Sequence, residues 1–452
     1  MPGLRRVLVA NRGEIAIRII RACLDEGIES VLVVSEADRQ TAAAYLADRV
    51  VCIGPGPSSQ SYLDIDRVMA AALGTDCDGL HPGYGFLAER PELSQACADH
   101  NVTFVGPNAD TIRRGGDKVL ARALARENGV PVGSGSDALD DARQARELAD
   151  SVGYPVLLKA AAGGGGRGMV LVESGNELEA KFASASHEAL QAFGDGRLYV
   201  ERYIRRARHV EVQILGDSFG TVVHLGERDC SMQRRFQKVV EEAPAFALAE
   251  HVRTGLHTAA LSLAKALSYV GAATVEFIVD ADTGDASFLE INTRVQVEHP
   301  VTELVTGIDI VREQLRIAGG LPLSFSQADV TIDGHAIECR VNAENPALDF
   351  LPMPGTVTRW IPPQGGGVRV DSHVYGGYTI PPYYDSMIAK VLTHGTDRSQ
   401  AITRMERALE HFVIEGVVTN RDFLTAIISH PDFVEQRHST RWIEESFLSN
   451  PA

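Results

Sequence analysis

Residues 7–34, VLVANRGEIAIRIIRACLDEGIESVLVV, decide the fold class of the N-terminal region. The stretch begins and ends with short, continuously apolar runs, Val7 to Ala10 and Val31 to Val34. Between them, apolar residues from Ile15 to Cys23 recur at the spacing of one helical face. Runs that are apolar throughout are typical of parallel strands covered on both faces. The sequence therefore predicts a strand, a helix and a parallel strand, the unit of a layered α/β fold.

The loop after the first run lacks the glycine pattern of a dinucleotide site. Residues 10–14 are Ala-Asn-Arg-Gly-Glu, which does not match G-x-G-x-x-G. Residues 102–105, before Gly106-Pro107, predict a further strand of the same layer. We therefore expect a Rossmann-like domain without its usual cofactor.

The composition is that of a globular protein. The 452 residues correspond to about three domains. Hydrophobic residues make up 44% and charged residues 23%, which excludes a disordered, collagen-like or disulfide-scaffold protein. The net charge of -17 argues against nucleic acid or an anionic membrane as a partner, although it is compatible with a local basic pocket.

The cysteines indicate the compartment. Six of them are scattered along the chain without a C-x-x-C pair or a zinc-like spacing to histidine.

The sequence also lacks the apolar segments of membrane or secreted proteins. We find no apolar run of the ~18 residues that a membrane span needs, and no apolar core of a signal peptide at the start. These features predict a reducing, cytoplasmic location and no membrane partner.

The pattern changes after Pro107, which predicts a domain boundary near 110–117. Strand-like runs dominate from Pro155 onward. From His335 the chain has Pro- and Gly-rich loops and ends in amphipathic helical patterns, which indicates a further domain. Helical patterns between these points lie at about 118–128, 141–152, 248–268 and 303–318.

A glycine-rich segment, Lys159-Ala-Ala-Ala-Gly-Gly-Gly-Gly-Arg-Gly-Met169, lies between two strand-like runs. Glycines at a hairpin tip let backbone N–H groups approach phosphates. Gly163, Gly165 and Gly168 match G-x-G-x-x-G, but a strand follows, and Met169 replaces the lysine of a P-loop, so neither of those sites is predicted. A flexible linker is the alternative. The flanking strands and cations favour a hinged flap over a nucleotide.

Two glutamates lie on runs that predict a β-hairpin, Glu276 and Glu290. If the hairpin is symmetric about Thr283, the two are cross-strand neighbours. Two carboxylates on one sheet face, with Cβ atoms about 5 Å apart, repel unless a cation lies between them. Hard oxygen ligands indicate Mg²⁺, with Asn292 on the same face as a further ligand. The alternatives are a solvated acidic hairpin and a one-residue register slip.

Directly after the hairpin, Arg294, Gln296 and Glu298 would point to one side of an extended chain. The guanidinium of Arg294 suits a small oxyanion, and Glu298 beside it is a candidate general base. A solvated edge strand is the alternative interpretation. Continuity with the acidic hairpin favours a reactive site.

Three further segments are ambiguous. Residues 227–242 crowd cations and anions together, which taken alone predicts surface charge. Cys230 and His209, taken singly, are most often structural. Residues 81–86, His-Pro-Gly-Tyr-Gly-Phe, predict a tight aromatic turn.

Together these motifs resemble the biotin carboxylase family, the ATP-grasp component of biotin-dependent carboxylases such as acetyl-CoA carboxylase. The resemblance covers essentially the whole chain. The segments that carry it are residues 7–16, 81–87, the glycine-rich flap, 227–244, 290–300 and 383–387.

The resemblance implies three domains: a Rossmann-like N-terminal domain over 1–115, a central ATP-grasp domain over 116–332 with a mobile glycine-rich lid at about 133–203, and a C-terminal α+β domain over 333–452. It implies ATP- and bicarbonate-dependent carboxylation of biotin on a carrier protein through carboxyphosphate, giving carboxybiotin, ADP and phosphate. This would be the first half-reaction of a biotin-dependent carboxylase, with an acyl-CoA as the expected type of final acceptor.

The resemblance also assigns site residues. ATP would contact Lys118, Lys159, Gly164, Gly165, Gly166, Glu201, Ile204, His209 and Gln233. Mg²⁺, or Mn²⁺ in its place, would lie on Glu276 and Glu290 with Asn292 nearby. Bicarbonate would be held by Lys238, Arg294, Gln296 and Val297, Glu298 would remove its proton, and Arg340 would face the biotin ureido group.

Two positions depart from the pattern of the family. Phe236 stands where many relatives carry a nucleotide-contacting histidine, so that contact is not transferred. Ala162 stands where the flap often has another glycine, which would stiffen the start of the flap. Neither position carries a reacting group.

The chain ends at Ala452 without a biotinylation site or a carboxyltransferase region. The resemblance therefore implies a separate biotin carboxyl carrier protein or domain and a carboxyltransferase subunit, which selects the final acceptor. A homodimer is implied by the family alone. Two alternative functions stay open: another ATP-grasp ligase that joins a carboxylate to an amine, and a nucleotide-binding regulatory module that has lost catalysis. The small-anion pocket disfavours the first, and the retained charged residues disfavour the second.

Overall fold

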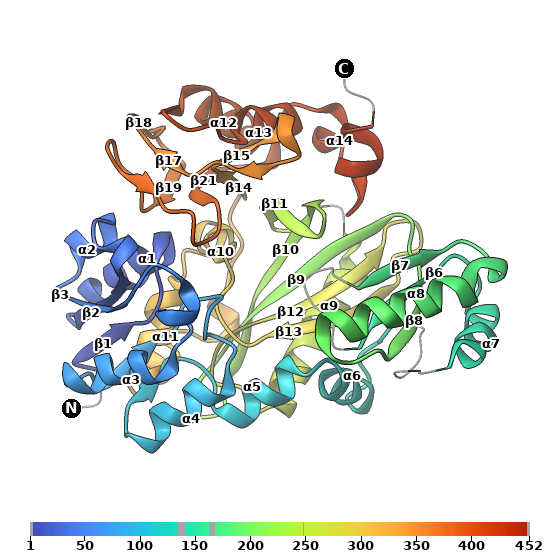
Figure 1. Ribbon diagram of the computed structural model, residues 1–452, viewed down its shortest axis with the longest axis horizontal. Coiled ribbons are helices and arrows are strands. Elements are labelled where there is room, and N and C mark those ends of the chain that lie inside the picture. Colours follow the sequence, from blue (N-terminus) through green and yellow to red (C-terminus); the bar gives the residue numbers. More distant parts are fainter. Residues whose placement is uncertain (1–2, 134–138, 140, 162–167, 247, 450–452) are drawn as a thin grey trace.

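The computed structural model describes residues 3–133, 139, 141–161, 168–246 and 248–449. Figure 1 shows the N-terminal region in blue at the left, the C-terminal region in orange to red above it, and a lobe from the middle of the chain projecting to the right. Among the described helices, we find none long and apolar enough to cross a lipid bilayer.

The N-terminal region is a five-stranded parallel sheet with helices on both faces. Its elements are β1 (Arg6–Val9), α1 (Gly13–Asp25), β2 (Glu29–Ser35), η1 (Glu36–Asp38), α2 (Ala42–Leu46), β3 (Arg49–Gly54), η2 (Ser58–Gln60), α3 (Ile65–Gly74), β4 (Gly79–His81), α4 (Pro91–Asp99), β5 (Thr103–Phe104) and α5 (Ala109–Gly116). The strand order is β3-β2-β1-β4-β5, which is a Rossmann-like arrangement.

The predicted strand–helix–strand unit is confirmed. β1 pairs parallel with β2, with Val7 opposite Ser30. Val7 and Val9 pack on the side of α1, whereas Leu8 packs on the opposite side with α3 and α4. Both faces of β1 are covered, which explains why its sequence is apolar without alternation.

The central region contributes a long antiparallel sheet and a separate small one. Its elements are α6 (Lys118–Glu127), α7 (Ala142–Val152), β6 (Val156–Ala160), β7 (Met169–Val172), α8 (Gly175–Phe193), β8 (Leu198–Arg202), β9 (Ala207–Gly216), β10 (Val222–Arg234), β11 (Gln237–Ala243), α9 (Glu250–Ala266), β12 (Gly271–Asp280), β13 (Ala286–Asn292), α10 (His299–Thr306), α11 (Ile310–Ala318) and η3 (Gln327–Asp329).

The C-terminal region continues that sheet. Its elements are β14 (His335–Asn342), β15 (Glu344–Asn345), η4 (Pro346–Leu348), β16 (Leu351–Pro352), β17 (Gly355–Thr356), β18 (Arg359–Ile361), β19 (Val368–Ser372), β20 (Thr379–Ile380), β21 (Met387–Gly395), α12 (Arg398–His411), β22 (Val413–Glu415), α13 (Arg421–Ile428), α14 (Pro431–Val434) and the π-helix η5 (Ile443–Phe447).

One eight-stranded sheet therefore joins the central and C-terminal regions, in the order β13-β12-β9-β10-β11-β14-β21-β19. Every neighbouring pair in it is antiparallel. The contact between β11 and β14 is the seam between the two regions. Residues far apart in the chain are thus held in one rigid frame.

The projecting lobe is a three-stranded antiparallel sheet, β7-β6-β8, covered by α7 and α8 (Figure 1). Lys159 at the end of β6 pairs with Met169 at the start of β7, so the predicted hairpin around the glycine-rich segment is confirmed. Residues 162–167, which include Ala162 and the predicted flap residues Gly164, Gly165 and Gly166, lie outside the described residues.

The mixed α/β class is confirmed, but three local predictions are wrong. Residues 227–233 and 239–242 are buried parts of β10 and β11 rather than surface charge, whereas the tip of their hairpin, around Arg235, is exposed. Residues 293–298 are a bend and a turn leading into α10 rather than an extended strand. The helix predicted at 303–318 is two helices, because Gly307 adopts φ +69° and Asp309 caps a new helix.

Candidate active site

The two predicted acids face each other. In the β12–β13 hairpin, Glu276 is the cross-strand partner of Glu290. Nearer the loop, Phe277 pairs with Phe288, so Leu289 is an extra residue on β13. This β-bulge shifts the register by one residue. Without it Glu276 would lie opposite Leu289, and the carboxyls would point to opposite faces.

Lys238 is the cation at the centre of the site. Its Nζ lies 2.6 Å from Glu211 Oε2, 3.0 Å from Glu276 Oε1 and 2.6 Å from Glu298 Oε1. Burial opposes the charge of the ammonium, but the three carboxylates raise the pKa of Lys238 well above its ordinary value. Lys238 therefore stays a cation and holds acids from three separate segments in one place.

A row of polar residues on β9 extends the site. His209, Glu211 and Gln213 alternate with valine and isoleucine along the strand. His209 Nε2 lies 3.1 Å from Glu276 Oε2. Burial lowers the pKa of His209, but the charge of Glu276 outweighs it and raises the pKa to about 9. His209 therefore faces the acidic hairpin as a cation at neutral pH.

Arg294 is fixed by three neighbours. Nε donates to Glu89 Oε2 at 2.9 Å, Nη1 to Gln296 Oε1 at 2.8 Å, and Nη2 to Asn292 Oδ1 at 3.0 Å. Gln296 in turn donates to Glu276 Oε1 at 3.2 Å. The segment is not a strand, yet these polar side chains converge as the alternation predicts. The guanidinium of Arg294 lies on a bend and is held in place by several acceptors, so it is suited to bind a small oxyanion.

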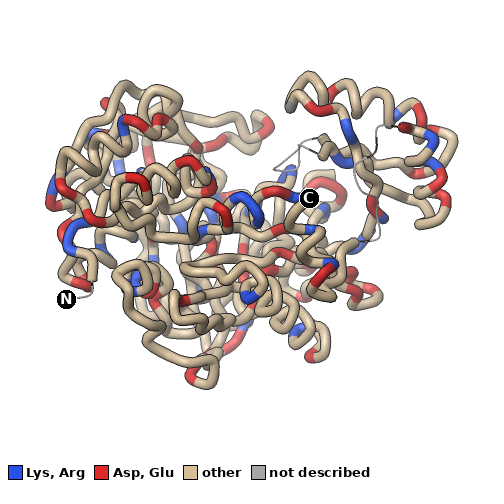
Figure 2. Tube along the Cα trace, turned by 90° about the horizontal axis from the view of Figure 1, so that it is seen from below, with Lys and Arg blue, Asp and Glu red and all other residues tan. Residues whose placement is uncertain are grey.

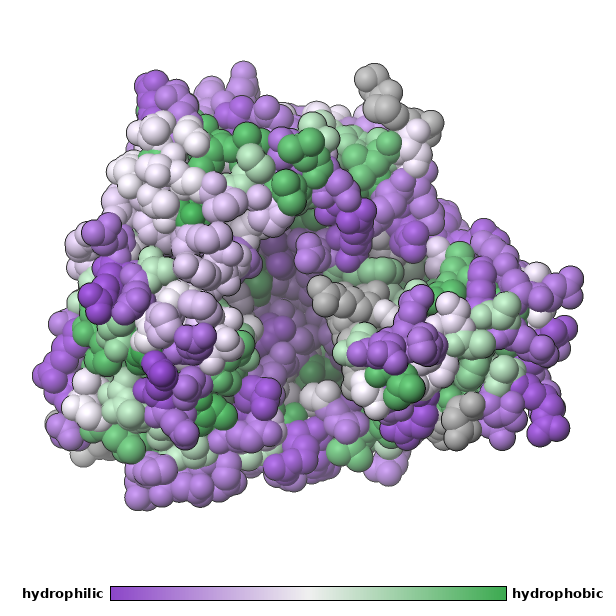
Figure 3. Space-filling view, in the orientation of Figure 1, coloured by the Kyte–Doolittle hydropathy of each residue, from purple (hydrophilic) through white to green (hydrophobic). Residues whose placement is uncertain are grey.

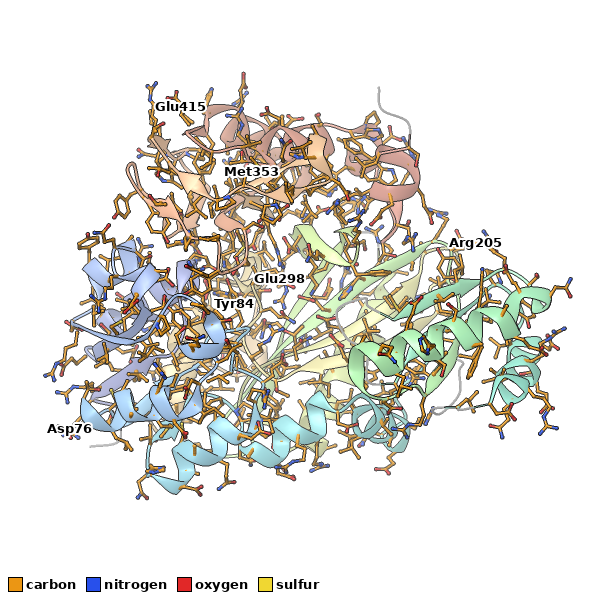
Figure 4. The ribbon with its side chains drawn as sticks, in the orientation of Figure 1. Asp76, Tyr84, Arg205, Glu298, Met353 and Glu415 are labelled. Carbon is orange, nitrogen blue, oxygen red and sulfur yellow. The ribbon has the colours of Figure 1, made fainter. Side chains whose placement is uncertain are left out.

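Glu298 lies at the inner end of this loop and is 0% exposed. Its Oε1 accepts from Lys238, and its Oε2 accepts from Arg340 Nη2 at 2.9 Å. Burial raises the pKa of Glu298, but the charges of Lys238 and Arg340 outweigh burial and lower it below its ordinary value. The carboxylate is therefore ionised at neutral pH. Figure 4 shows Glu298 near the centre of the molecule, with Tyr84 of the N-terminal region close to it in this view.

The described residues among those assigned to ATP line the space between the hairpin and the projecting lobe. Lys159 on β6 and Arg122 on α6 both form ion pairs with Glu201 on β8. Lys118 Nζ lies 3.7 Å from Glu290 Oε2. The cavity lining includes Lys118, Lys159, Glu201, Ile204, His209 and Gln233.

A cavity of about 2290 Å³ joins these groups. It is larger than the roughly 300–1,000 Å³ of a site for one small molecule, so it has room for a nucleotide and a second substrate. Figure 3 shows the hollow between the three parts of the molecule, with a hydrophilic lining. Figure 2 shows acidic and basic residues mixed along the chain. Arg294, Gln296, Val297 and Arg340 also line the cavity, and Glu298 lies beneath its wall.

Hard oxygen donors at the hairpin fit a divalent cation. Burial and the charge of Glu276 raise the pKa of Glu290, which faces only Lys118 among the described ion-pair partners. A cation between the two carboxylates would relieve that repulsion. Asn292 is already engaged, because its amide donates to Glu276 and its Oδ1 accepts from Arg294. Glu276 and Glu290 are therefore the side chains suited to bind the cation, and Asn292 holds Glu276 in place by a hydrogen bond.

Several site residues were missed by the sequence reasoning. Glu211 was detectable, because it alternates with His209 and Gln213 on a predicted strand. Glu241 lies in the charged segment 227–242, whose pattern taken alone predicts surface charge. Glu89, Arg122 and Lys390 carried no such signal, since each comes from a distant element and only the tertiary fold brings it to the site.

Three family models match successive parts of the chain. They are "Biotin carboxylase, N-terminal domain" over residues 3–112, "Carbamoyl-phosphate synthase L chain, ATP binding domain" over 117–326, and "Biotin carboxylase C-terminal domain" over 338–445. Together they cover most of the sequence. Biotin carboxylase 1 of Bacillus subtilis (strain 168) is 50% identical over 442 residues, 98% of each chain.

Solved structures agree with this relationship. A biotin carboxylase–β,γ-ATP complex from Campylobacter jejuni has a TM-score of 0.93 and 48% identity, and the match covers 97% of this chain and 98% of that one. The biotin carboxylase domain dimer of Hydrogenobacter thermophilus 2-oxoglutarate carboxylase, with MgADP, ADP and bicarbonate, has a TM-score of 0.93 and 44% identity over 98% of each chain.

Proposed function

The chain belongs to the biotin carboxylase family, and from this premise we propose how its own residues carry out ATP- and bicarbonate-dependent carboxylation of biotin. It is an ATP-dependent ligase, and the product is carboxybiotin on a carrier protein. The observation that carries the assignment of roles is the position of Glu298, held between Lys238 and Arg340 beside the acidic hairpin.

Bicarbonate binding follows from the charges of the loop before α10. We assign the anion to Lys238, Arg294, Gln296 and Val297, which line the same part of the cavity. Glu298 is ionised and adjacent, so it takes the proton of bicarbonate. The deprotonated oxygen is then a better nucleophile for the γ-phosphate of ATP, and attack on that phosphate gives carboxyphosphate and ADP.

Nucleotide binding is assigned to the residues that line the cavity between the lobe and the hairpin, namely Lys118, Lys159, Glu201, Ile204, His209 and Gln233, together with Gly164, Gly165 and Gly166. Glu276 and Glu290, with Asn292, would hold Mg²⁺, or Mn²⁺ in its place, which neutralises phosphate charge when bound. Lys118 and Lys159 add positive charge beside the carboxylates of the hairpin and of β8.

The second half of the reaction requires a closed site. Carboxyphosphate hydrolyses in water, so solvent must be excluded while it breaks down to CO₂ and phosphate. Phosphate then takes the proton of the ureido N1′. Arg340 lines the cavity and donates to the ureido oxygen, which stabilises the enolate-like biotin that attacks CO₂.

Steady-state ATP cleavage tests this function. We expect ATP cleavage to depend on bicarbonate, and carboxybiotin to form when free biotin is added. A carboxylate–amine ligase would instead need an amine, and a lapsed regulatory module would bind ATP without cleaving it. ATP cleavage that is independent of bicarbonate would contradict the proposal.

Replacing Arg340 should separate ATP cleavage from carboxylation. In Arg340→Ala we expect bicarbonate-dependent ATP cleavage to continue, while carboxybiotin formed per phosphate released falls by about tenfold or more, because the ureido oxygen loses a charge-assisted hydrogen bond. Arg340→Lys keeps the positive charge but lacks the planar guanidinium with its paired donors, so it should give an intermediate ratio of carboxybiotin to phosphate. An unchanged ratio in Arg340→Ala would exclude the assigned role.

We also propose the surroundings of the reaction. Domain boundaries at 1–115, 116–332 and 333–452, with a lid at about 133–203, are compatible with the sheets described above. The partners are a biotin carboxyl carrier protein or domain, a carboxyltransferase subunit and a second copy of this chain. The homodimer is supported by the dimer in the related Hydrogenobacter structure, and light scattering tests it. Six free cysteines support a reducing cytoplasm.

A further inference from the structure

A second pair of acids is buried behind the site. Where β11 and β14 run antiparallel, Glu241 is the cross-strand partner of Glu338. Both side chains are 0% exposed. Among the described residues, neither oxygen of Glu338 has a hydrogen-bond partner, and Oε2 of Glu241 has none. Two adjacent carboxyls at this depth cannot both be charged without a large cost, so the pair retains a proton.

The acid pair lies on the face of the sheet that α10 covers. Glu241, Glu338, Arg340 and Lys390 share this face, because Glu241 pairs with Glu338 and Arg340 pairs with Lys390 two residues further along β14. The apolar residues that pack this face against α10 are Ala243, Val301, Val305, Ala336 and Leu392. Glu298 is the residue that precedes α10, so its carboxyl ends beside the acid pair.

Arg340 is shared by two carboxyls. Its Nε donates to Glu241 Oε1 at 2.6 Å, and its Nη2 donates to Glu298 Oε2 at 2.9 Å. The two acids have different fates during the reaction. Glu298 becomes neutral when it takes the proton of bicarbonate, so its ion pair with Arg340 weakens. Glu241 is outside the reacting groups and keeps its hydrogen bond.

We propose that Glu241 is a positioning residue, which holds Arg340 toward the ureido oxygen while Glu298 carries the bicarbonate proton. In the acid pair, Glu338 keeps the proton and Glu241 is the ionised carboxylate. This inference rests on the proposed function. It explains why a second carboxyl contacts Arg340 in a site that already contains the general base.

The charges around the pair support this division. The charged groups that face it are Lys238, Glu298, Arg340 and Lys390, with the thiol of Cys339 beside it. Burial, with the charge of Glu298, raises the pKa of Glu241 to about 7 despite Arg340. Burial and the charge of Glu241 raise the pKa of Glu338 well above its ordinary value despite Lys390. Glu241 is therefore the member that is ionised in the neutral range.

The test is the pH dependence of coupling in Glu241→Gln. Carboxybiotin and phosphate are measured with ATP, bicarbonate and free biotin from about pH 6 to pH 9. In the unaltered protein, carboxybiotin per phosphate should fall as the pH is lowered through about 7, because Glu241 becomes protonated. In Glu241→Gln the ratio should be about tenfold lower above that pH and lack this step, while bicarbonate-dependent ATP cleavage stays within about threefold.

Glu242→Gln is the matched control on the same strand. Glu242 is buried and pairs with Arg398 and His335, away from Arg340. We expect this variant to lose thermal stability but to keep both the ratio and the pH step. If Glu241→Gln keeps the ratio and the step, or Glu242→Gln loses them equally, the inference is overturned.

A second variant covers the case in which Glu241→Gln does not fold. Glu338→Gln replaces the protonated carboxyl with a neutral amide, so the pH step should stay within about one unit of its original position. A larger shift would show that Glu338 is charged and would overturn the inference. If the unaltered protein shows no bicarbonate-dependent ATP cleavage, the proposed function itself fails; if it does, only the role of Glu241 is at stake.

Discussion

Replacing Glu298 with glutamine should reduce bicarbonate-dependent ATP cleavage by about 10²–10⁴-fold, the usual contribution of a general base. Glutamine has the shape of glutamate, but its one carbonyl oxygen can accept from only one of the two cations, Lys238 and Arg340, and it cannot take a proton. The affinity for ATP should change little, because Glu298 lies beneath the cavity wall and away from the nucleotide residues. Turnover and equilibrium binding of ATP measure the two effects separately.

Glu303→Gln is the control for this prediction. Glu303 is a buried glutamate on the adjoining helix α10, and it pairs with Arg18 and Arg369 outside the cavity lining. We expect this variant to lose stability while its turnover per folded molecule stays near that of the unaltered protein. Unchanged turnover in Glu298→Gln would refute the assigned base, whatever the control shows.

Replacing Lys238 with methionine should cause the largest loss of stability at the site. Lys238 lies against three carboxylates, and its removal leaves Glu211, Glu276 and Glu298 close together without this cation. Breaking a buried ion pair typically costs about 3–5 kcal/mol. Bicarbonate-dependent ATP cleavage should also be lost, because the small-anion pocket loses its ammonium group. Denaturant unfolding and turnover measure the two losses.

The loss of stability in Lys238→Met should depend on pH. In the unaltered protein, the charge of Lys238 opposes the effect of burial and lowers the pKa of both Glu211 and Glu298. Without Lys238, burial and the mutual repulsion of the acids oppose the remaining cations, Arg228 and Arg340. We expect both pKa values then to rise above their unfolded values, so that the folded state binds more protons than the unfolded state and stability falls as the pH rises. The deficit should therefore be smaller at about pH 6 than at about pH 8. Lys265→Met, at an exposed lysine on α9, should show neither effect. A deficit that is the same at both pH values would contradict the burial of three ionised acids.

The acidic hairpin shows how far sequence reasoning can reach. The symmetry argument predicts that Glu276 pairs with Glu290, and this is confirmed. Near the loop, however, the pairing differs by one residue from the symmetric register, since Phe277 lies opposite Phe288. The bulge at Leu289 restores the register in which Glu276 lies opposite Glu290. Alternation along a strand is a local signal, whereas a bulge depends on how the neighbouring strand twists and packs. The pairing was therefore predictable, but the reason for it was not.

Residues 227–242 show the opposite limit. Their mixed charges are typical of a solvated surface, because single isolated ions are rarely buried. In the structure each ion meets a partner from another segment: Arg228 meets Glu211, Lys238 meets Glu298, and Glu242 meets Arg398. These charged side chains can be buried only because the fold brings their partners to them. No local sequence pattern indicates which partners these are.

The parallel N-terminal layer, the two acids of the hairpin and the chemical types that bind a small anion could be predicted from local patterns, because apolar periodicity and side-chain chemistry are local properties. Which charges meet depends on the folded chain. The seam between β11 and β14 brings Glu241 to Glu338 and Arg340 to Glu298, and the electrostatic balance of these buried groups depends on distances that arise only when strands distant in the chain pair.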